Sequence, residues 1–404
     1  MKLLGKIRSE SLCLSNDMTR IRRDLHMMPE PALEEYDTSA YIIKELEKMG
    51  LEIKKLAGTG VLATLYGNEG EKTIAIRADI DALPIQEKND IEYSSKRPGF
   101  MHACGHDGHA AMALGAAGIL NDLKPYLKGN VKFIFQPAEE QYGGAERMIA
   151  GGALRDPDVD AIIALHLWPD FEKGKICFKD GCIMASNDKV EISVKGRGGH
   201  GAMPHLCVDA LTVGCSVVNN IQTFVSREIN PLDNVVITLG TFNSGSAYNV
   251  VSDITKITGT VRAVNESTRS FIEKRLKEIV DCTCRTYGAE YDFNYVKQYP
   301  PTINNHDLNE FFMDTASDID GKDNVVVFDR PYMTAEDFSY YLKNVPGCLC
   351  FLGTRDEKYN HPLHNERFNF DEDVMAKGAA FMAACAVSFL NNPSEVDKNY
   401  EFAG

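Results

Sequence analysis

The alternation of short apolar runs with helical stretches is the feature that most restricts how this chain folds. The apolar runs are residues 73–78, 131–135, 160–165 and 347–352, and helical patterns such as 107–123 separate them. Runs of this length between helices predict an α/β fold whose sheet is mostly parallel and flanked by helices. Ligands of such open sheets bind at the carboxyl ends of the strands. Polar side chains that follow these runs are therefore the first candidates for a functional site.

A second pattern interrupts the first between residues 187 and 299. It predicts strands at 188–195, 234–241, 253–263 and 290–298 and helices at 208–228 and 267–287. This order, β-α-β-β-α-β, is that of a ferredoxin-like unit. We therefore predict a discontinuous catalytic domain, residues 1–186 and 300–404, with an α+β lid domain inserted at 187–299 whose tips close over the site.

The segment MHACGHDGH, residues 101–109, concentrates one thiol and three imidazoles. Cysteine and histidine are ligands of zinc and similar metals, and Cys104 and His106 are close enough in sequence to share a site. We expect His102 and His109 to support or cap rather than to ligate. Further ligand types follow the predicted strands and should meet at one sheet edge. The predicted ligand set is Cys104, His106, Glu140, His166 and His364.

Five ligands are too many for one tetrahedral zinc that keeps an open position for water. We therefore predict two ions with bridging groups, as in hydrolytic sites where the metals activate a water and polarise a carbonyl. Glu139 is the natural proton shuttle, because neighbours in extended chain project in different directions and Glu140 can ligate meanwhile. Asp79 or Asp81, after the first run, should ligate a metal or orient a ligand imidazole.

The charge balance bears on the class of partner. The chain has 43 Lys and Arg against 58 Asp and Glu, a formal net charge of -15. Nucleic acid and anionic membrane are poor partners for such a chain, so we expect a small-molecule substrate. Residues 1–25 hold no apolar stretch of signal-peptide length, and the 11 cysteines follow no disulfide framework spacing. These features predict a soluble protein of the reducing cytoplasm.

A set of motifs spread over nearly the whole chain carries a family resemblance. The motifs are RADIDALP, MHACGHDGH, QPAEE, the strand end at His166, GRGGHGAMPH and PLHNERF. Together they resemble the amidohydrolase branch of the aminoacylase and dimetal carboxypeptidase family, which includes hippurate hydrolases, auxin-conjugate hydrolases and N-acetyl-diaminopimelate deacetylases. The resemblance implies a dimetal exopeptidase-like fold with two divalent ions, manganese or zinc and alternatively cobalt or nickel. It also implies a homodimer or higher homo-oligomer formed through the lid domain.

The resemblance also implies roles for single residues. The five predicted ligands fall on the family's ligand positions, Glu139 on its general base, and His200 on a lid histidine that stabilises the oxyanion. Asn249 and Arg262 resemble residues that meet the substrate carboxylate. Aligned on Pro84, Asp81 takes the orienting role, while Asp79 stands where the wider family has a histidine ligand.

The thiol ligand adds one further expectation. Cys104 lies near a helix start, so we expect a lowered thiol pKa and sensitivity to oxidation.

The reaction implied is hydrolysis of the amide bond of an N-acyl amino acid, giving a carboxylate and a free amino acid. The alternative is a dipeptidase or carboxypeptidase that uses the same dimetal site and differs in its acyl pocket. A third hypothesis, from another class, is a metal-dependent binding or regulatory protein without turnover. Its mark would be a missing ligand or base, and the motifs lack neither.

Overall fold

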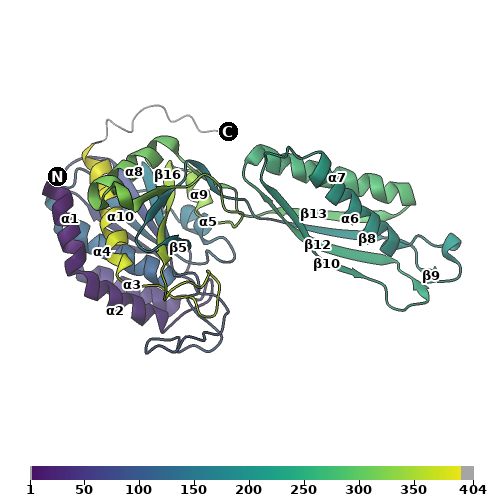
Figure 1. Ribbon diagram of the computed structural model, residues 1–404, viewed down its shortest axis with the longest axis horizontal. Coiled ribbons are helices and arrows are strands. Elements are labelled where there is room, and N and C mark those ends of the chain that lie inside the picture. Colours follow the sequence, from purple (N-terminus) through teal and green to yellow (C-terminus); the bar gives the residue numbers. More distant parts are fainter. Residues whose placement is uncertain (1, 393–404) are drawn as a thin grey trace. The chain divides into compact units, whose positions relative to one another are not determined.

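The computed structural model describes residues 2–392 and divides into two compact units (Figure 1). Unit 1 contains the chain up to Gly181, Ile303–Arg330 and the chain from Asp337 on. Unit 2 contains Cys182–Thr302 and Pro331–Glu336. The chain thus leaves unit 1 and returns to it, so that unit 2 is an insertion.

A mixed eight-stranded sheet forms the centre of unit 1, in the order β1-β2-β4-β3-β5-β16-β6-β15. Its central pairs, β4 with β3, β3 with β5 and β5 with β16, are parallel, whereas β1 and β2 form an antiparallel hairpin at one edge. Because β3, β4 and β16 are almost fully buried, they read as continuous apolar runs. The strands are β1 Glu52–Leu56, β2 Gly60–Tyr66, β3 Thr73–Asp79, β4 Asn130–Gln136, β5 Ala161–Glu172, β6 Ile176–Phe178, β15 Val325–Val327 and β16 Gly347–Arg355.

Helices flank this sheet, which confirms the predicted α/β fold (Figure 1). Helix α4 is buried along nearly its whole length and packs against α2 and α10. Helix α10 is the one described helix long and apolar enough to cross a membrane, but 83% of it is buried inside the protein, as expected for a core helix. The helices are α1 Lys2–Cys13, α2 Ser15–His26, α3 Tyr36–Lys48, α4 His106–Asp122, α5 Gly144–Ala150, α8 His306–Asp320, α9 Ser339–Leu342 and α10 Val374–Asn391, with short 3-10 turns at Lys124–Tyr126 and Lys322–Asn324.

Unit 2 is built on an antiparallel four-stranded sheet in the order β10-β12-β8-β13. Two helices, α6 and α7, pack on this sheet and enclose a separate apolar core. The elements are β8 Asp188–Lys195, α6 Ala210–Arg227, β10 Val235–Ser244, β12 Ile254–Ala263, α7 Glu266–Tyr287 and β13 Glu290–Lys297, which is the predicted β-α-β-β-α-β order. Short elements are β7 Gly181–Met184, β9 Gly199–His200, a 3-10 turn at Pro204–Leu206, β11 Val250–Val251 and β14 Thr302–Asn304.

Candidate metal centre

The five predicted ligands converge at the carboxyl edge of the unit 1 sheet. Ligand atoms of Cys104, His106 and Glu140 all lie within 4.8 Å of one another. The Sγ of Cys104 lies 3.6 Å from Nε2 of His166, and Nε2 of His364 lies 3.2 Å from Oε1 of Glu140. The structure therefore brings side chains from four separate segments to one place.

Two glycines give the ligand-bearing loops their shape. Gly105 has φ +86°, a left-handed conformation that places a sharp turn between Cys104 and the first residue of α4, His106. After the two glutamates, a Cβ at Gly144 would lie 1.6 Å from the carbonyl oxygen of Pro137. Only glycine fits there, because the loop closes on itself with the Gly144 N–H donating to Ala138 O at 3.0 Å.

Backbone contacts set the tautomers of two histidines. The Nδ1 of His106 lies 2.9 Å from the carbonyl of Asp81, and the Nδ1 of His166 lies 2.7 Å from the carbonyl of Leu167. A carbonyl only accepts, so each Nδ1 donates and each Nε2 is the ring nitrogen left to bind a metal ion. Within residues 2–392, the buried Nε2 of His106 has no hydrogen-bond partner. A buried ring nitrogen without a hydrogen-bond partner, beside the thiol of Cys104 and the carboxylate of Glu140, fits a site for a divalent metal ion.

The charges of the site point the same way. Burial alone would lower the pKa of His106, but Asp79, Asp81 and Glu140 together raise it to about 10. Burial would raise the pKa of Glu140, yet His364 and His106 lower it. A positive charge among these carboxylates is therefore stabilising, and either a protonated His106 or a bound metal ion can carry it.

The expectation of a lowered Cys104 pKa is wrong when only the protein groups around the thiol are considered. Cys104 is 7% exposed, and burial raises the pKa of its thiol well above the ordinary value. The carboxylates of Glu140, Glu139 and Asp79 raise it further, which outweighs the nearby helix start. The sequence placed these carboxylates in the same site, but it did not show how deeply the sulfur is buried.

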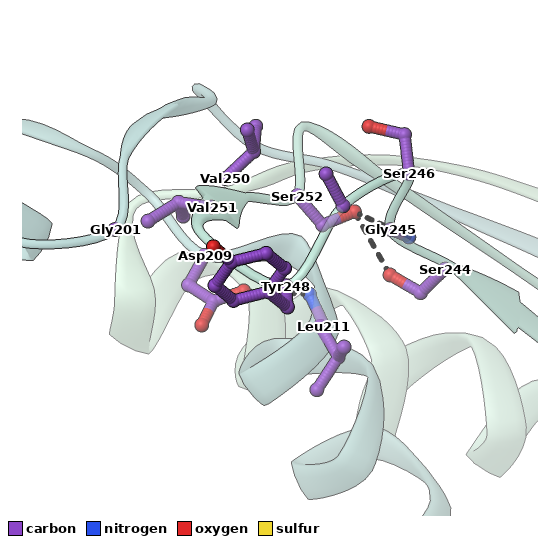
Figure 2. Close-up of a pocket in the computed structure, with 11 residues that line it drawn as sticks. Gly201, Asp209, Leu211, Ser244, Gly245, Ser246, Tyr248, Val250, Val251 and Ser252 are labelled. Carbon is purple, nitrogen blue, oxygen red and sulfur yellow. Dashed lines mark hydrogen bonds between the residues drawn. The ribbon is translucent and has the colours of Figure 1, made fainter.

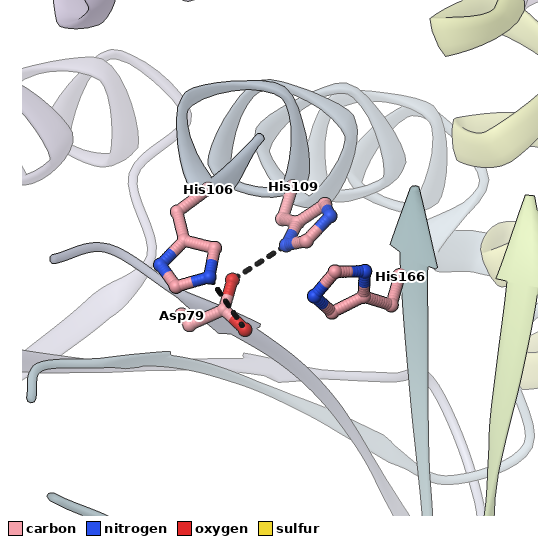
Figure 3. Close-up of side chains that lie close together, drawn as sticks. All are labelled: Asp79, His106, His109 and His166. Carbon is pink, nitrogen blue, oxygen red and sulfur yellow. Dashed lines mark hydrogen bonds and ion pairs between the residues drawn. The ribbon is translucent and has the colours of Figure 1, made fainter. Parts of the chain in front are cut away.

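Asp79 and His109 lie next to the predicted ligands His106 and His166 (Figure 3). The Nδ1 of His109 donates to Oδ1 of Asp79 at 2.6 Å, and its Nε2 accepts from the Leu167 N–H at 2.9 Å. Oδ2 of Asp79 accepts from Arg77 at 2.7 Å. Both nitrogens of His109 are thus engaged, so His109 has none left for a metal. Through the Leu167 peptide, the Asp79–His109 pair also fixes the backbone that orients His166.

Asp81 holds the loop of the two glutamates. Its Oδ1 accepts from the Glu139 N–H at 3.1 Å, and its Oδ2 accepts from the Glu140 N–H at 3.0 Å. Oδ1 also lies 3.3 Å from Nδ1 of His106. One buried carboxylate therefore contacts the backbone of both glutamates and the ring of a ligand.

Sequence reasoning missed two groups that support this site. Glu35 is fully buried and accepts from the Ala138 N–H at 2.9 Å, directly before Glu139. On the other side, Arg22 and His26 of α2 both contact Oδ2 of Asp107 at 2.8 Å, next to the ligand His106. These pairs lie more than 80 residues apart in sequence, and no local pattern signals them.

The three other predicted site residues lie in unit 2. His200 on β9 pairs with Val250 on β11, and the N–H of the next residue, Gly201, donates to Asn249 O at 2.8 Å. Arg262 lies near the end of β12, eight residues from its first residue, Ile254. At about 3.3 Å per residue, this is about 26 Å along the strand. The structure thus brings His200 and Asn249 together. Asn249 comes just before β11, and β11 leads into the first residue of β12. Arg262 lies near the other end of β12.

A pocket of about 540 Å³ is lined by Gly201, which follows His200 in the chain, and by Tyr248 and Val250, which flank Asn249 (Figure 2). The loop 244–252 forms most of its wall, and Gly201, Asp209 and Leu211 complete it. Oγ of Ser252 lies 2.9 Å from Oγ of Ser244, which ties the two ends of this loop together. Tyr248 is fully exposed at the pocket.

Comparison with known proteins places this geometry in a family. Residues 75–388 match the model of peptidase family M20/M25/M40. The chain belongs to this family. The match spans both units of the M20-family fold and includes all five predicted ligands.

Relatives of this M20-family protein include enzymes of two kinds. It is 42% identical over 293 residues to the N-acyl-L-amino acid amidohydrolase of Geobacillus stearothermophilus, covering 72% of this chain and 79% of that protein. It is 37% identical over 398 residues to thermostable carboxypeptidase 2 of Saccharolobus solfataricus, covering 97% and 100%. A solved Bacillus subtilis structure, described as a dinuclear metal-binding peptidase of the M20 family, matches with a TM-score of 0.83 and 32% identity over 94% of this chain and 99% of that one. The M20-family protein is therefore a hydrolase.

The buried Glu35 predicts a pH-dependent stability of the M20-family protein. Burial and the nearby Asp81 raise the pKa of Glu35 from 4.5 to about 7, against the opposing effect of the Thr59 hydroxyl. The folded protein then binds an extra proton between about pH 4.5 and 7, so stability falls as the pH rises through this window. Above pH 7 the buried charge costs on the order of 3 kcal/mol.

Glu35→Gln removes this cost, so the unfolding temperature of the variant relative to the parent should be higher at pH 8 than at pH 5. Thermal unfolding of the metal-loaded proteins at both pH values measures the difference. Glu34→Gln is the matched control, because it removes a charge from an exposed neighbour. Equal differences at the two pH values would contradict the prediction.

Proposed function

We propose that this protein hydrolyses the amide bond of N-acyl amino acids, releasing a carboxylate and a free amino acid. The observation that carries the proposal is the convergence of Cys104, His106, Glu140, His166 and His364 beside Glu139. The ligand set suits two divalent ions, manganese or zinc, with cobalt or nickel as alternatives, because cysteine, histidine and glutamate side chains are all present. The amidohydrolase of Geobacillus stearothermophilus supports the choice of N-acyl amino acids.

The roles of the residues follow from their positions. When bound, the ions supply an activated water and polarise the carbonyl that it attacks. Glu139 takes the proton from that water and returns it to the departing nitrogen. Asp81 fixes the backbone at Glu139 and Glu140 by accepting from their N–H groups, and it also contacts the ring of His106.

We also propose that residues 187–299 act as a lid and dimerisation domain. His200 would stabilise the oxyanion, and Asn249 and Arg262 would bind the substrate carboxylate. The separation of about 26 Å along β12 supports a homodimer, because one copy of the lid cannot easily present both of its ends to one metal centre. In a dimer, one copy can supply Arg262 and its partner His200 and Asn249.

The cytoplasm is the compartment that we propose. No disulfide joins any of the 11 cysteines, all of which lie within residues 2–392, as expected for a reducing environment.

A carboxypeptidase or dipeptidase is the second candidate, favoured by the 37% identity to the carboxypeptidase of Saccharolobus solfataricus over nearly the whole chain. Both reactions use the same metal centre and differ in the group on the acyl side of the bond. Only activity on a panel of substrates separates them.

Chelation followed by metal restoration tests the proposal. We expect the chelated protein to lose activity and to regain it with manganese, zinc, cobalt or nickel, because the water cannot be activated without the ions. The substrates are N-acetyl and N-benzoyl amino acids and dipeptides, and the measurement is release of free amino acid. Preference for dipeptides would establish the second candidate. If no substrate of the panel releases free amino acid while metal is bound, the proposed function is contradicted.

A further inference from the structure

Glu35 occupies a fully buried position behind the loop that carries Glu139. Its Oε1 accepts from the Leu33 N–H and from the Ala138 N–H, each at 2.9 Å, and its Oε2 accepts from the Thr59 hydroxyl at 2.5 Å. The carboxylate therefore joins three segments: the turn before α3, the turn before β2 and the loop after β4. Only the last of these segments carries a residue of the proposed mechanism.

Three consecutive N–H groups of this last segment donate to side-chain carboxylates. The Ala138 N–H donates to Glu35, and the N–H groups of Glu139 and Glu140 donate to the two oxygens of Asp81. The backbone before the base is thus held by one carboxylate and the backbone at the base by another. Within residues 2–392, the first N–H of this series donates to Glu35 and not to Asp81, and the carbonyl of the same peptide, Pro137 O, accepts from Gln136 at 3.4 Å.

The first peptide is the one whose conformation needs support. Ala138 has φ +57°, in the left-handed region that residues with a Cβ rarely adopt. Leu33, the other backbone donor to Glu35, also lies there, with φ +67°. Glu35 Oε1 therefore binds two peptides in an unfavourable conformation, one of them directly before Glu139.

The position of Glu35 also costs stability. Burial and the neighbouring Asp81 raise its pKa to about 7, so the charged form is disfavoured there. A buried carboxylate that opposes folding and contacts the loop of the base is typical of a group kept for function.

We propose that Glu35 is a positioning residue for Glu139: by holding the Ala138 peptide in its left-handed conformation, it fixes the direction in which the side chain of the general base leaves the backbone. This inference rests on the proposed function, in which Glu139 transfers the proton. A small displacement of a catalytic group lowers the rate more than it lowers substrate binding.

The test compares Glu35→Ala, Glu35→Gln and the control Glu30→Ala. The side chain of Glu30 is also buried and accepts from two backbone N–H groups, those of Asp37 and Thr38, at the start of α3. Its hydrogen bonds within the described chain do not reach the loop of Glu139. Steady-state kinetics on the fastest N-acyl substrate, metal content, and hydrogen exchange of segment 137–144 are measured on the metal-loaded proteins.

For Glu35→Ala we expect kcat to fall roughly 30- to 100-fold with KM within about twofold and metal content unchanged. Segment 137–144 should exchange faster. Glu35→Gln should restore most of kcat, because the amide oxygen still accepts from both N–H groups and its NH₂ can donate to the Thr59 hydroxyl. Glu30→Ala should lose stability without a change in kcat.

A kcat within about twofold of the parent for folded, metal-loaded Glu35→Ala would overturn the inference. If Glu35→Ala does not fold, Thr59→Val decides: loss of the hydroxyl should lower kcat by roughly 3- to 10-fold, and an unchanged kcat overturns the inference. If the parent itself shows no turnover on the panel, the proposed function has failed. Hydrogen exchange then still tests the positioning: unchanged protection of segment 137–144 in Glu35→Ala overturns it.

Discussion

Replacement of Glu139 by glutamine should lower kcat by about 10³-fold or more while both metal ions stay bound. The expected loss is large because one group takes the proton from the water and returns it to the leaving nitrogen, and acid–base transfer of this kind accounts for about 10² to 10⁴ in rate. A glutamine side chain has the same shape as that of Glu139, and the backbone N–H of residue 139 still donates to Asp81, so the fold of the loop should not change. Steady-state kinetics and metal analysis of the same preparation measure both quantities.

The neighbouring glutamate is the matched control for this prediction. Glu140 lies within 4.8 Å of the ligand atoms of Cys104 and His106, so Glu140→Gln should lose metal as well as activity. Added metal should restore part of the activity of Glu140→Gln and none of that of Glu139→Gln. A Glu139→Gln protein that keeps kcat within tenfold of the parent, or that binds less metal, would contradict the role of Glu139 as the base.

Much of the fold could be predicted from the sequence because its elements have strong periodic patterns. Helix α4 was predicted at 107–123 and lies at His106–Asp122, and β3 and β4 lie within one residue of the predicted runs. The hairpin β1–β2 was not predicted: β1 is short and mostly exposed, so it lacks a buried apolar run, whereas β2 is a buried apolar run that the predicted strands did not include. Strands β6 and β15 have three residues each, too few to show a period.

The convergence of the metal ligands could be predicted because it follows from topology. Parallel strands end at one edge, so residues after β3 and β4 meet there whatever the loops do. His166 differs slightly, since β5 continues past it to Glu172 by pairing with β16. Its ring still reaches Cys104, because side chains in a strand stand out from the sheet.

The supporting contacts could not be predicted, because they depend on loop conformation and on distant pairs. Glu35 reaches Ala138 across 103 residues, and no local pattern signals the positive φ of Ala138. The raised pKa of Cys104 likewise depends first on the burial of its sulfur and then on carboxylates from other segments. Positions of this kind depart from local sequence rules, which is where functional strain is expected.

The ion pair between Arg22 and Asp107 is the distant contact with the largest expected effect on stability. Both side chains are almost completely buried, and the Arg22 guanidinium lies 2.8 Å from Oδ2 of Asp107 and over the ring of Phe370. Oδ1 of Asp107 has no hydrogen-bond partner within residues 2–392. Without Arg22, the buried carboxylate would keep only His26 as a partner.

Arg22→Met should therefore lower the unfolding free energy of the protein by about 3–5 kcal/mol, because it leaves a buried charge poorly compensated. Asp107 lies next to His106, so the variant should also bind metal more weakly. The next residue in the chain is the matched control: Arg23 is 44% exposed and pairs with Glu372, which also contacts Arg22. Arg23→Met should cost less than about 1 kcal/mol.

A double variant separates the loss of the charge pair from the loss of packing. Arg22→Met with Asp107→Asn removes both charges, so it should recover a large part of the stability lost in the single variant. Denaturant unfolding of the parent, Arg22→Met, Asp107→Asn and the double variant, with and without added zinc, measures the coupling between the two positions. If the double variant is as unstable as Arg22→Met, the contribution of Arg22 lies in its other contacts, with Asn369, Glu372 and Phe370, and the ion pair does not hold α2 to the first turn of α4.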